Sequence, residues 1–166
     1  MGSGESMKIG ILSDTHDQVE RTSRAVARLV EAGAEVLVHC GDITRPPVVL
    51  QCSGLPAYFV FGNNDYDHDA LGRAIRGTGG VSLGRGGLIE LGGKRIAVAH
   101  GDSAREVRRL LDPDPDYFLF GHSHVATDDR RGATRWINPG ALHRAEDYSV
   151  AVLDLEADAL EYLAID

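Results

Sequence analysis

The sequence predicts an α/β protein in which two mixed β-sheets pack face to face between outer helices, a four-layer α/β/β/α sandwich. In the first half, short apolar runs alternate with amphipathic segments, and this β-α-β-α-β order indicates parallel strands joined by right-handed crossovers. In the second half, short glycine-containing turns separate the apolar runs, which is typical of β-hairpins. The 166 residues are enough for one domain with a hydrophobic core.

The first half contains three predicted strands and two predicted helices. The first helix is expected to start at Asp17, because Asp17 and Glu20 have the spacing of a capping box, and Gly33 is suited to its C-cap. Pro46 and Pro47 open the second helix, where proline is favoured. The strands are predicted at 7–13, 36–40 and 57–61, and the helices at 17–33 and 45–52.

The second half begins with a predicted helix, followed by a glycine-rich stretch with frequent turns. Gly92 and Gly93 then separate two apolar runs, which predicts a hairpin, and Asp112 and Pro113 close a later helix. The expected elements are helices at 69–76 and 104–111, strands at 88–91, 95–99 and 117–120, and hairpins around Arg131-Gly132 and Ala157-Asp158.

The composition is that of an ordinary globular domain with an acidic surface. Hydrophobic residues make up 43% and charged residues 25%, and no apolar run is long enough to span a membrane. The net charge of −8 argues against stable nucleic-acid binding, which needs clusters of Lys and Arg. Residues 1–6 look like a tag remnant, residues 7–166 are expected to form a single domain, and the lack of a signal pattern favours a cytoplasmic location.

Four short polar clusters each follow an apolar run, and a lone histidine lies between the last two. The clusters read D-T-H, G-D, G-N-N-D and G-H-S-H. Because each follows a predicted strand, their side chains are expected to meet in the crevice beyond the strand ends. Seven oxygen and nitrogen ligands are too many for one tetrahedral ion and suit two ions that share a carboxylate. The candidate metal ligands are Asp14, His16, Asp42, Asn63, His100, His122 and His124.

This pattern resembles the calcineurin-like metallophosphoesterases, whose motifs run D-x-H, G-D, G-N-H-D, a single His and G-H-x-H. The resemblance extends from Lys8 to the end of the chain. It implies that two metal ions bind, with Asp42 as the bridging ligand. By this resemblance the first ion takes Asp14, His16, Asp42 and His124, and the second takes Asp42, Asn63, His100 and His122.

The short length and the Asn138-Pro139-Gly140 motif resemble the small bacterial and archaeal phosphodiesterase branch of this family. That branch also contains a eukaryotic retromer subunit that works as a scaffold. The resemblance implies a metal-dependent phosphoesterase, and more specifically a phosphodiesterase, in which two ions activate a water for in-line attack at phosphorus. A non-catalytic metal-binding scaffold and a phosphomonoesterase are the alternatives, and the complete ligand set argues against the scaffold.

One position departs from the family pattern. Asn64 stands where the family has a His that, by resemblance, protonates the leaving group and is oriented by the next residue, here Asp65. An amide cannot act as a general acid, so Asp65 is expected to lack its usual partner. Members of the small branch often lack this His, so activity is still expected. The catalytic candidates are Asp42, Asn63, Asn64, Asp65 and His100.

The ligand types also bear on the metal, the partners and the cysteines. Mn²⁺ is the expected ion, and Fe, Zn²⁺, Ni²⁺ and Co²⁺ are alternatives that accept the same nitrogen and oxygen ligands. The expected partner is a small phosphorylated substrate, with no nucleic acid or membrane, and formation of a homo-oligomer is left open.

Cys40 precedes Gly41-Asp42, so a metal or redox role is an alternative to the favoured interpretation of a small buried residue. Cys40 and Cys52 are the two cysteines of the sequence, and two cysteines are too few for a disulfide framework.

Several neighbours of these motifs have competing interpretations. Gly41, Gly62 and Gly121 are expected where the backbone approaches the site closely or adopts positive φ. His39 is expected to be a packed residue, because strand alternation points it away from the face of its neighbour.

Two further side chains could reach the substrate. His68 is interpreted as a solvated helix start, with a substrate contact as the alternative. Arg144 either binds a phosphate oxygen or is an exposed loop residue, and the sequence does not separate the two. Trp136 is expected to pack against other apolar residues.

Overall fold

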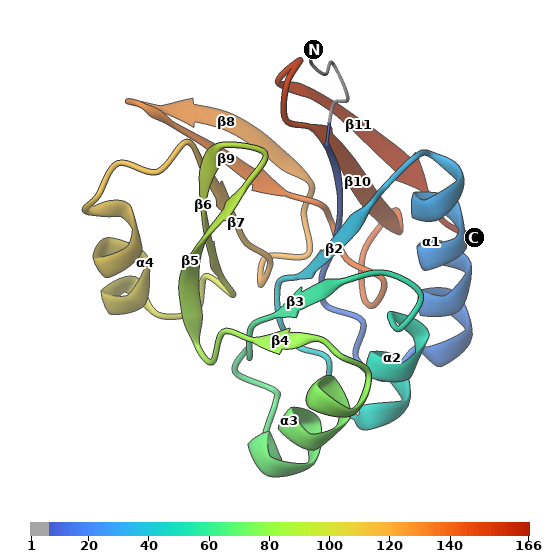
Figure 1. Cartoon of the computed structure of the whole chain (residues 1–166). Coiled ribbons are helices and arrows are strands. Elements are labelled where there is room, and N and C mark those ends of the chain that lie inside the picture. Colours follow the sequence, from blue (N-terminus) through green and yellow to red (C-terminus); the bar gives the residue numbers. More distant parts are fainter. Residues whose placement is uncertain (1–6) are drawn as a thin grey trace.

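The computed structural model describes residues 7–166, and the expected tag remnant at 1–6 lies outside them. Two β-sheets pack against each other, with helices on their outer faces (Figure 1). The six-stranded sheet has the order β11-β10-β1-β2-β3-β4, and the five-stranded sheet has the order β5-β6-β7-β9-β8. Each sheet contains parallel and antiparallel pairs, so the predicted sandwich of two mixed sheets is confirmed.

The first sheet is built on the predicted β-α-β-α-β segment. Its strands β1, β2, β3 and β4 are parallel, and β10 adds to β1 in the antiparallel direction. The end of the chain therefore completes the sheet that its beginning starts. The bounds are β1 Lys8–Leu12, α1 Val19–Glu31, β2 Val36–His39, α2 Pro46–Gln51, β3 Ala57–Phe59, α3 His68–Gly77, β4 Val81–Ser82, β10 Ser149–Asp154 and β11 Ala159–Ala164.

The second sheet contains the predicted hairpins. β5 and β6 pair across Gly92 and Gly93, β8 and β9 pair antiparallel, and β6, β7 and β9 run parallel. The helix α4 connects β6 to β7. The bounds are β5 Gly86–Leu91, β6 Lys94–Ala99, α4 Ala104–Leu111, β7 Tyr117–Leu119, β8 Thr127–Arg131 and β9 Thr134–Asn138.

Three apolar clusters separate the four layers. Leu37 belongs to the cluster between the first sheet and its helices, whereas its neighbour Val38 belongs to the cluster between the two sheets. This difference follows from the alternation of side chains along β2. Phe118 and Leu110 belong to the third cluster, between the second sheet and α4. The strands β1 and β2 are therefore buried on both faces, which holds their C-terminal loops in fixed positions.

Two local details differ from the sequence prediction. Asp17 does not cap α1, because the helix begins after Gln18 and has no side-chain cap. Instead Asp17 has a φ of 62°, and its backbone N–H donates to Ile43 O at 3.2 Å, since the D-T-H loop packs on the loop after β2. The predicted helix at 69–76 begins one residue earlier and is capped by Asp67, which accepts from Ala70 N–H. The glycine-rich stretch also contains the short strand β4.

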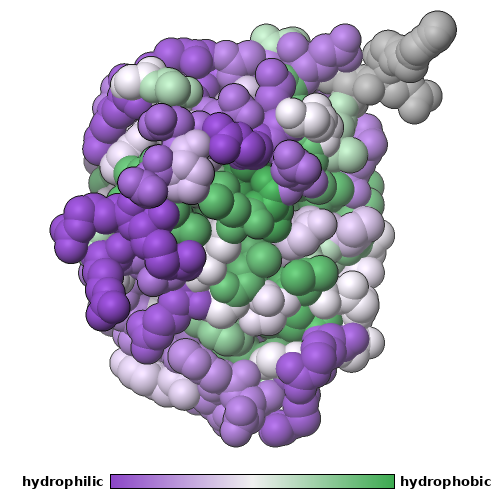
Figure 2. Space-filling model, turned by 60° about the vertical axis from the view of Figure 1, so that its left-hand side comes forward, coloured by the Kyte–Doolittle hydropathy of each residue, from purple (hydrophilic) through white to green (hydrophobic). Residues whose placement is uncertain are grey.

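Among residues 7–166, α4 is the single helix on the outer side of the second sheet. On the side of the molecule where α4 lies, apolar residues reach the surface between polar ones (Figure 2). Leu88 of β5 is 42% exposed. No helix in the described part of the chain combines the length and the apolar character needed to cross a membrane.

Candidate metal centre

The loops that follow the strands lie against one another at one edge of the sandwich. Asp14, after β1, donates its backbone N–H to Gly41 O at 2.9 Å, which ties the first loop to the second. Gly121, after β7, donates to His100 O at 3.0 Å, which ties the last two loops. These main-chain contacts place the predicted ligands of different loops side by side.

Four of the predicted ligands form a compact group: Asp14, His16, Asp42 and His124. One ligand atom from each lies within 4.8 Å of the others. His124 Nε2 is 3.2 Å from Asp14 Oδ1, and His16 Nε2 is 3.3 Å from Asp42 Oδ2. Carboxylate and imidazole are ligands that first-row divalent metals accept. The group coincides with the first ligand set that the family resemblance implies.

His100 lies on the other side of the same carboxylate. Its Nε2 is 3.3 Å from Asp42 Oδ2, and its Nδ1 lies 2.8 Å from Cys40 O, so Nδ1 donates and Nε2 is left for the cluster. The His122 ring lies edge-on to His100, with 5.1 Å between centroids. Asn63 lies on an exposed turn, and within the described residues its side chain makes no hydrogen bond. The structure therefore brings Asp42, His100 and His122 of the second ligand set together, whereas the Asn63 side chain makes no contact with them that the structure records.

The cluster fits a cation. Among the described residues, three of its buried atoms have no hydrogen-bond partner, namely Asp14 Oδ1, His16 Nε2 and His100 Nε2. An unsatisfied buried polar group costs about 1–3 kcal/mol, so three in one place need an explanation. All three belong to side chains that can ligate a metal, and a bound cation would satisfy them together.

The electrostatics of the cluster agree with this interpretation. The nearby carboxylates of Asp14 and Asp42 raise the pKa of His16 to about 9. Burial lowers the pKa of His100, but Asp42 and Asp14 outweigh it and raise the value to about 9. Burial also opposes ionisation of Asp42, yet His100 and His16 hold its pKa well below the usual range. The carboxylates are thus ionised and ready to ligate, and a metal would displace the protons on the two rings.

Five candidate ligands have left-handed backbone, which non-glycine residues rarely adopt. Such a conformation costs on the order of 1–3 kcal/mol per residue and is concentrated at functional sites. The φ values are 53° for Asp14, 41° for His16, 59° for Asp42, 74° for His122 and 63° for His124. The loops therefore hold their ligands at an energetic cost, as expected for a site that is stabilised by what it binds.

The three glycines beside the ligands leave no room for a side chain. A Cβ on Gly62 would lie 2.3 Å from Asp42 Oδ1, and one on Gly41, whose φ is 103°, would lie 2.7 Å from His100 Nδ1. A Cβ on Gly121 would lie 2.0 Å from Ser13 Oγ. The expected close approach of backbone to the site is found at each of them.

We expect Gly121→Ala to destabilise the protein and to weaken metal binding. The added methyl group would also lie 2.4 Å from Asp14 Oδ2, so the ligand must move. Overpacking of this kind costs about 1–3 kcal/mol, which thermal denaturation can measure. Gly54→Ala is the matched control, because nothing lies within 4 Å of its added Cβ. Equal melting temperatures for the two variants would contradict this prediction.

Asp65 has a different role from the one predicted. As expected, it has no histidine partner at position 64, and its buried carboxylate instead accepts three backbone N–H groups, from Asp42 at 2.8 Å, Gly62 at 2.8 Å and Thr44 at 2.7 Å. Asn64 donates from Nδ2 to Asp42 Oδ2 at 3.0 Å, and its backbone N–H donates to Asp42 Oδ1 at 2.9 Å. Asp65 therefore fastens two ligand loops together and does not orient the side chain at position 64.

The sequence also gave no indication of the role of Asn138. This buried side chain donates to Gly121 O at 3.1 Å and to Ser123 Oγ at 3.1 Å, and it accepts from Gly140 N–H at 2.9 Å. It therefore holds the G-H-S-H loop in place. The N-P-G motif was the available signal, but a motif alone does not identify a contact with a loop so distant in sequence.

Two histidines that are not candidate ligands lie beside the cluster. His39 accepts from Gly41 N–H through Nδ1 at 3.1 Å, and its Nε2 lies 3.1 Å from Thr15 Oγ1. Burial lowers the pKa of His39 to about 4, so the ring is neutral and packed, as predicted. His143 stacks on His16 with 4.6 Å between ring centroids. The sequence had not singled out His143 as a neighbour of the ligands.

The remaining residues in question can now be placed. His68 is exposed at the start of α3 and stacks on Phe61, which agrees with a helix start. Arg144 is exposed, and its carbonyl lies 3.2 Å from His124 Nδ1, so its main chain orients a ligand. Trp136 packs in the apolar cluster under α4, as predicted. Both cysteines are free and buried, and burial raises the pKa of the Cys40 thiol, which agrees with the structural interpretation.

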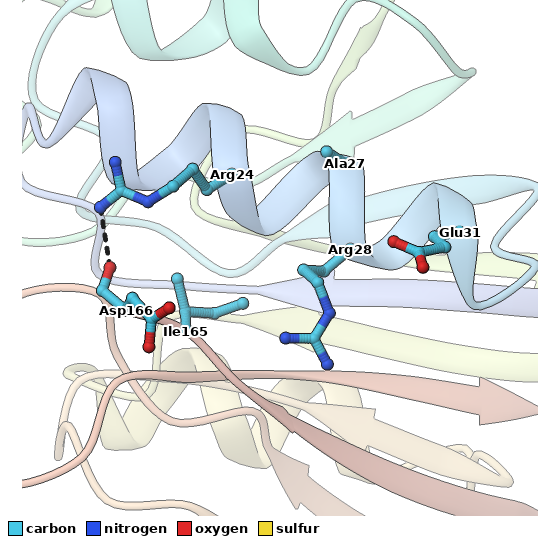
Figure 3. Close-up of a pocket in the computed structure, with 6 residues that line it drawn as sticks. All are labelled: Arg24, Ala27, Arg28, Glu31, Ile165 and Asp166. Carbon is cyan, nitrogen blue, oxygen red and sulfur yellow. Dashed lines mark hydrogen bonds between the residues drawn. The ribbon is translucent and has the colours of Figure 1, made fainter.

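A separate pocket of about 250 Å³ lies between α1 and the residues after β11 (Figure 3). Arg24 and Arg28 of α1 line it, and Arg24 donates to Asp166 O at 2.7 Å. It shares no residue with the metal-ligand cluster and contains none of the predicted site residues. We therefore place the candidate active site at the cluster and not in this pocket.

Carboxylates and imidazoles gathered at the strand ends of a two-sheet sandwich define a metal-binding α/β protein. The chain belongs to the calcineurin-like phosphoesterase superfamily, whose domain model matches residues 7–158. It is 30% identical to a probable metallophosphoesterase of Bacillus subtilis, with 92% of this chain and 87% of the relative covered. It is 25% identical to a phosphodiesterase of Methanocaldococcus jannaschii, with 81% and 83% covered. These relatives support a metal-dependent phosphoesterase.

Solved structures share the fold. An archaeal phosphodiesterase superposes with a TM-score of 0.87 at 22% identity, covering 95% of this chain and 99% of that one. Vps29 of Entamoeba histolytica, in a complex with Zn²⁺, superposes with a TM-score of 0.61 at 16% identity, covering 96% and 99%. At these identities the likeness concerns the fold alone, so the function rests on the family and on the residues of the site.

Proposed function

We propose that this protein hydrolyses small phosphodiesters at a site that holds two divalent metal ions, with Mn²⁺ as the first candidate. The cluster of buried, unsatisfied ligand atoms is the observation that carries the proposal. The first ion would be held by Asp14, His16, Asp42 and His124, and the second by Asp42, Asn63, His100 and His122. Such a pair of ions lowers the pKa of a bound water and neutralises charge on the phosphoryl oxygens.

The residues of the chain position this centre. Asp42 Oδ2 lies 3.3 Å from the Nε2 atoms of both His16 and His100, which supports a role for Asp42 as the ligand shared by the two proposed ions. The carbonyl groups of Cys40 and Arg144 lie beside the Nδ1 atoms of His100 and His124, and they fix which ring nitrogen faces the cluster. Asp14, Asp42 and His100 are buried, which strengthens the charge interactions among them.

Asn64 shapes the reaction in a different way from the family His. Its side chain donates to Asp42 and accepts a hydrogen bond from the Tyr66 hydroxyl at 3.1 Å, so it is held at the rim of the site. It can contact a substrate oxygen but cannot supply a proton. The leaving group must therefore depart as an anion or take its proton from water.

The test of the proposed function is a substrate panel measured with each metal after chelation. We expect measurable hydrolysis of activated phosphodiesters, greatest with Mn²⁺, and slower hydrolysis of the matched monoesters. Chelation should remove the activity and added metal should restore it, because Asp14 Oδ1, His16 Nε2 and His100 Nε2 have no hydrogen-bond partner among the described residues. Faster turnover of monoesters throughout the panel would make the enzyme a phosphomonoesterase. Absence of turnover with every metal would favour the scaffold alternative.

The rate should fall steeply as the pKa of the leaving group rises. General acid catalysis contributes on the order of 10²–10⁴-fold, and that contribution is missing where Asn64 replaces His. Asn64→His should flatten the dependence, although the carboxylate of Asp65, which would orient the ring in the family pattern, already accepts three backbone N–H groups. Rates over a series of aryl and alkyl diesters measure both slopes. Identical slopes at matched metal content would show that position 64 does not govern protonation of the leaving group.

The remaining proposals concern the surroundings of the enzyme. The acidic net charge of −8 supports a small phosphorylated substrate over nucleic acid. A membrane partner is not expected. A cytoplasmic location and a homo-oligomeric state stay predictions, which fractionation and light scattering can test.

A further inference from the structure

A pocket of about 260 Å³ opens directly beside the metal-ligand cluster. Its volume is below the 300–1,000 Å³ of a pocket that encloses a whole drug-sized ligand, so it suits one small group. The described residues that line it are His124, Val125, Ala126, Glu146, Asp147 and Ser149. They come from the G-H-S-H loop and the two residues between it and β8 on one side, and from the loop before β10 and the first residue of β10 on the other.

The inner end of this pocket belongs to the catalytic centre. His124 lines the pocket, and its Nε2 lies 3.2 Å from Asp14 Oδ1. That oxygen is fully buried and has no hydrogen-bond partner in the described part of the chain, so a ligand is expected there on independent grounds. A phosphoryl group bound at the cluster would therefore have one of its ester groups at the mouth of this pocket.

The pocket combines a small apolar wall with two negative charges. Val125 is 61% exposed and Ala126 is exposed beside it, so they offer methyl groups to a ligand. Neither Glu146 nor Asp147 has an ion-pair or hydrogen-bond partner among the described residues. None of the six lining residues is Lys or Arg, and Arg144 of the same loop does not line the pocket.

This lining discriminates between substrates by charge. A second phosphate on the substrate would be repelled by the two carboxylates, which disfavours nucleoside polyphosphates. A group with methyl or methylene carbons around a positive nitrogen would satisfy both the apolar wall and the carboxylates. We propose that this pocket selects phosphodiesters whose second ester group is a small alkylammonium alcohol. This inference rests on the proposed phosphodiesterase function and adds the substrate class to it.

The first test compares two diesters with the same leaving group. One is para-nitrophenyl phosphorylcholine, and the other is its neutral analogue with carbon in place of the quaternary nitrogen. In both, water adds to phosphorus, the P–O bond to para-nitrophenolate breaks, and the alkyl phosphate and a proton are released. The chemical step is therefore matched, and only the group in the pocket differs.

We expect kcat/KM to be about 10-fold higher for the cationic diester, chiefly through KM, because exposed ion pairs contribute modestly. The ratio should shrink as salt is added. The double variant Glu146→Gln, Asp147→Asn should bring the ratio to about one. The charge-matched control is Glu35→Gln with Asp112→Asn, two exposed residues that do not line the pocket, and it should keep the preference.

A binding measurement separates this inference from the proposed function. The methyl resonances of Val125 and Ala126 report on the pocket, so NMR titrations with choline and with its neutral carbon analogue follow binding without turnover. We expect shifts with choline that disappear in the double variant. If neither diester is hydrolysed but choline still shifts these resonances, the phosphodiesterase proposal fails and the pocket assignment stands. Equal rates for the two diesters in the native protein, or a preference that persists in the double variant, would overturn the assignment.

Discussion

Replacing Asp42 with Asn should lower the proposed phosphodiesterase activity by on the order of a thousand-fold or more, at or beyond the upper end of the 10²–10³-fold typical for loss of one stabilising group. The Asp42 carboxylate lies between His16 and His100 and is held by the backbone and side chain of Asn64. An amide of the same shape removes the negative charge with which Asp42 would hold the two proposed ions. Asp42→Ala should be at least as damaging. The measurement is kcat/KM on an activated diester, together with metal content per chain.

Asp129→Asn is the control for this prediction. Asp129 is half exposed on β8, where it pairs with Arg131, and it is not part of the cluster. It makes the same chemical change without touching a ligand, so its activity and metal content should match those of the native protein. If Asp42→Asn kept a tenth of the native rate with full metal content, Asp42 would not be the shared ligand.

Local patterns in the sequence predicted the elements well. The helix Ala104–Leu111 was predicted with the bounds that the structure shows, because Asp112 and Pro113 marked its end in the sequence. The structure adds that Ser103 caps its start. The Gly92-Gly93 turn likewise identified the β5–β6 hairpin. These signals depend on residues close together in the chain, which is why they can be recognised without a structure.

Features that depend on distant residues could not be predicted in the same way. Asp17 had the spacing of a helix cap, but its main chain is bound to Ile43 across the fold. Nothing in the sequence indicated that β10 would insert between β11 and β1, since that choice depends on how whole faces pack. The candidate ligands were recognised from motifs at strand ends. The sequence also drew attention to Asp65 and Asn138, but their role in holding the ligand loops could not be predicted, because the partners that show it lie far away in sequence.

Removing the charge of Asp65 should have the largest effect on stability. The buried carboxylate accepts backbone N–H groups from Asp42, Thr44 and Gly62, and in Asp65→Asn the amide nitrogen would face one of these donors. An unsatisfied buried group costs about 1–3 kcal/mol, and more where a charged acceptor is lost, so a loss of about 2–4 kcal/mol in unfolding free energy is expected. Activity should fall as well, since the backbone of Asp42 is released.

Asp67→Asn provides a control two residues away. Asp67 caps α3 through a single bond from Ala70 N–H, and Asn is an equally good cap, so its unfolding free energy should change little. Urea denaturation of both variants in chelator measures the difference without metal. Added Mn²⁺ should then stabilise Asp65→Asn less than the native protein, because the stabilisation of the folded state by a metal grows with the logarithm of its affinity for the loops. Equal stability of the two variants would show that Asp65 does not hold the ligand loops together. A normal metal response in a destabilised Asp65→Asn would limit its role to folding.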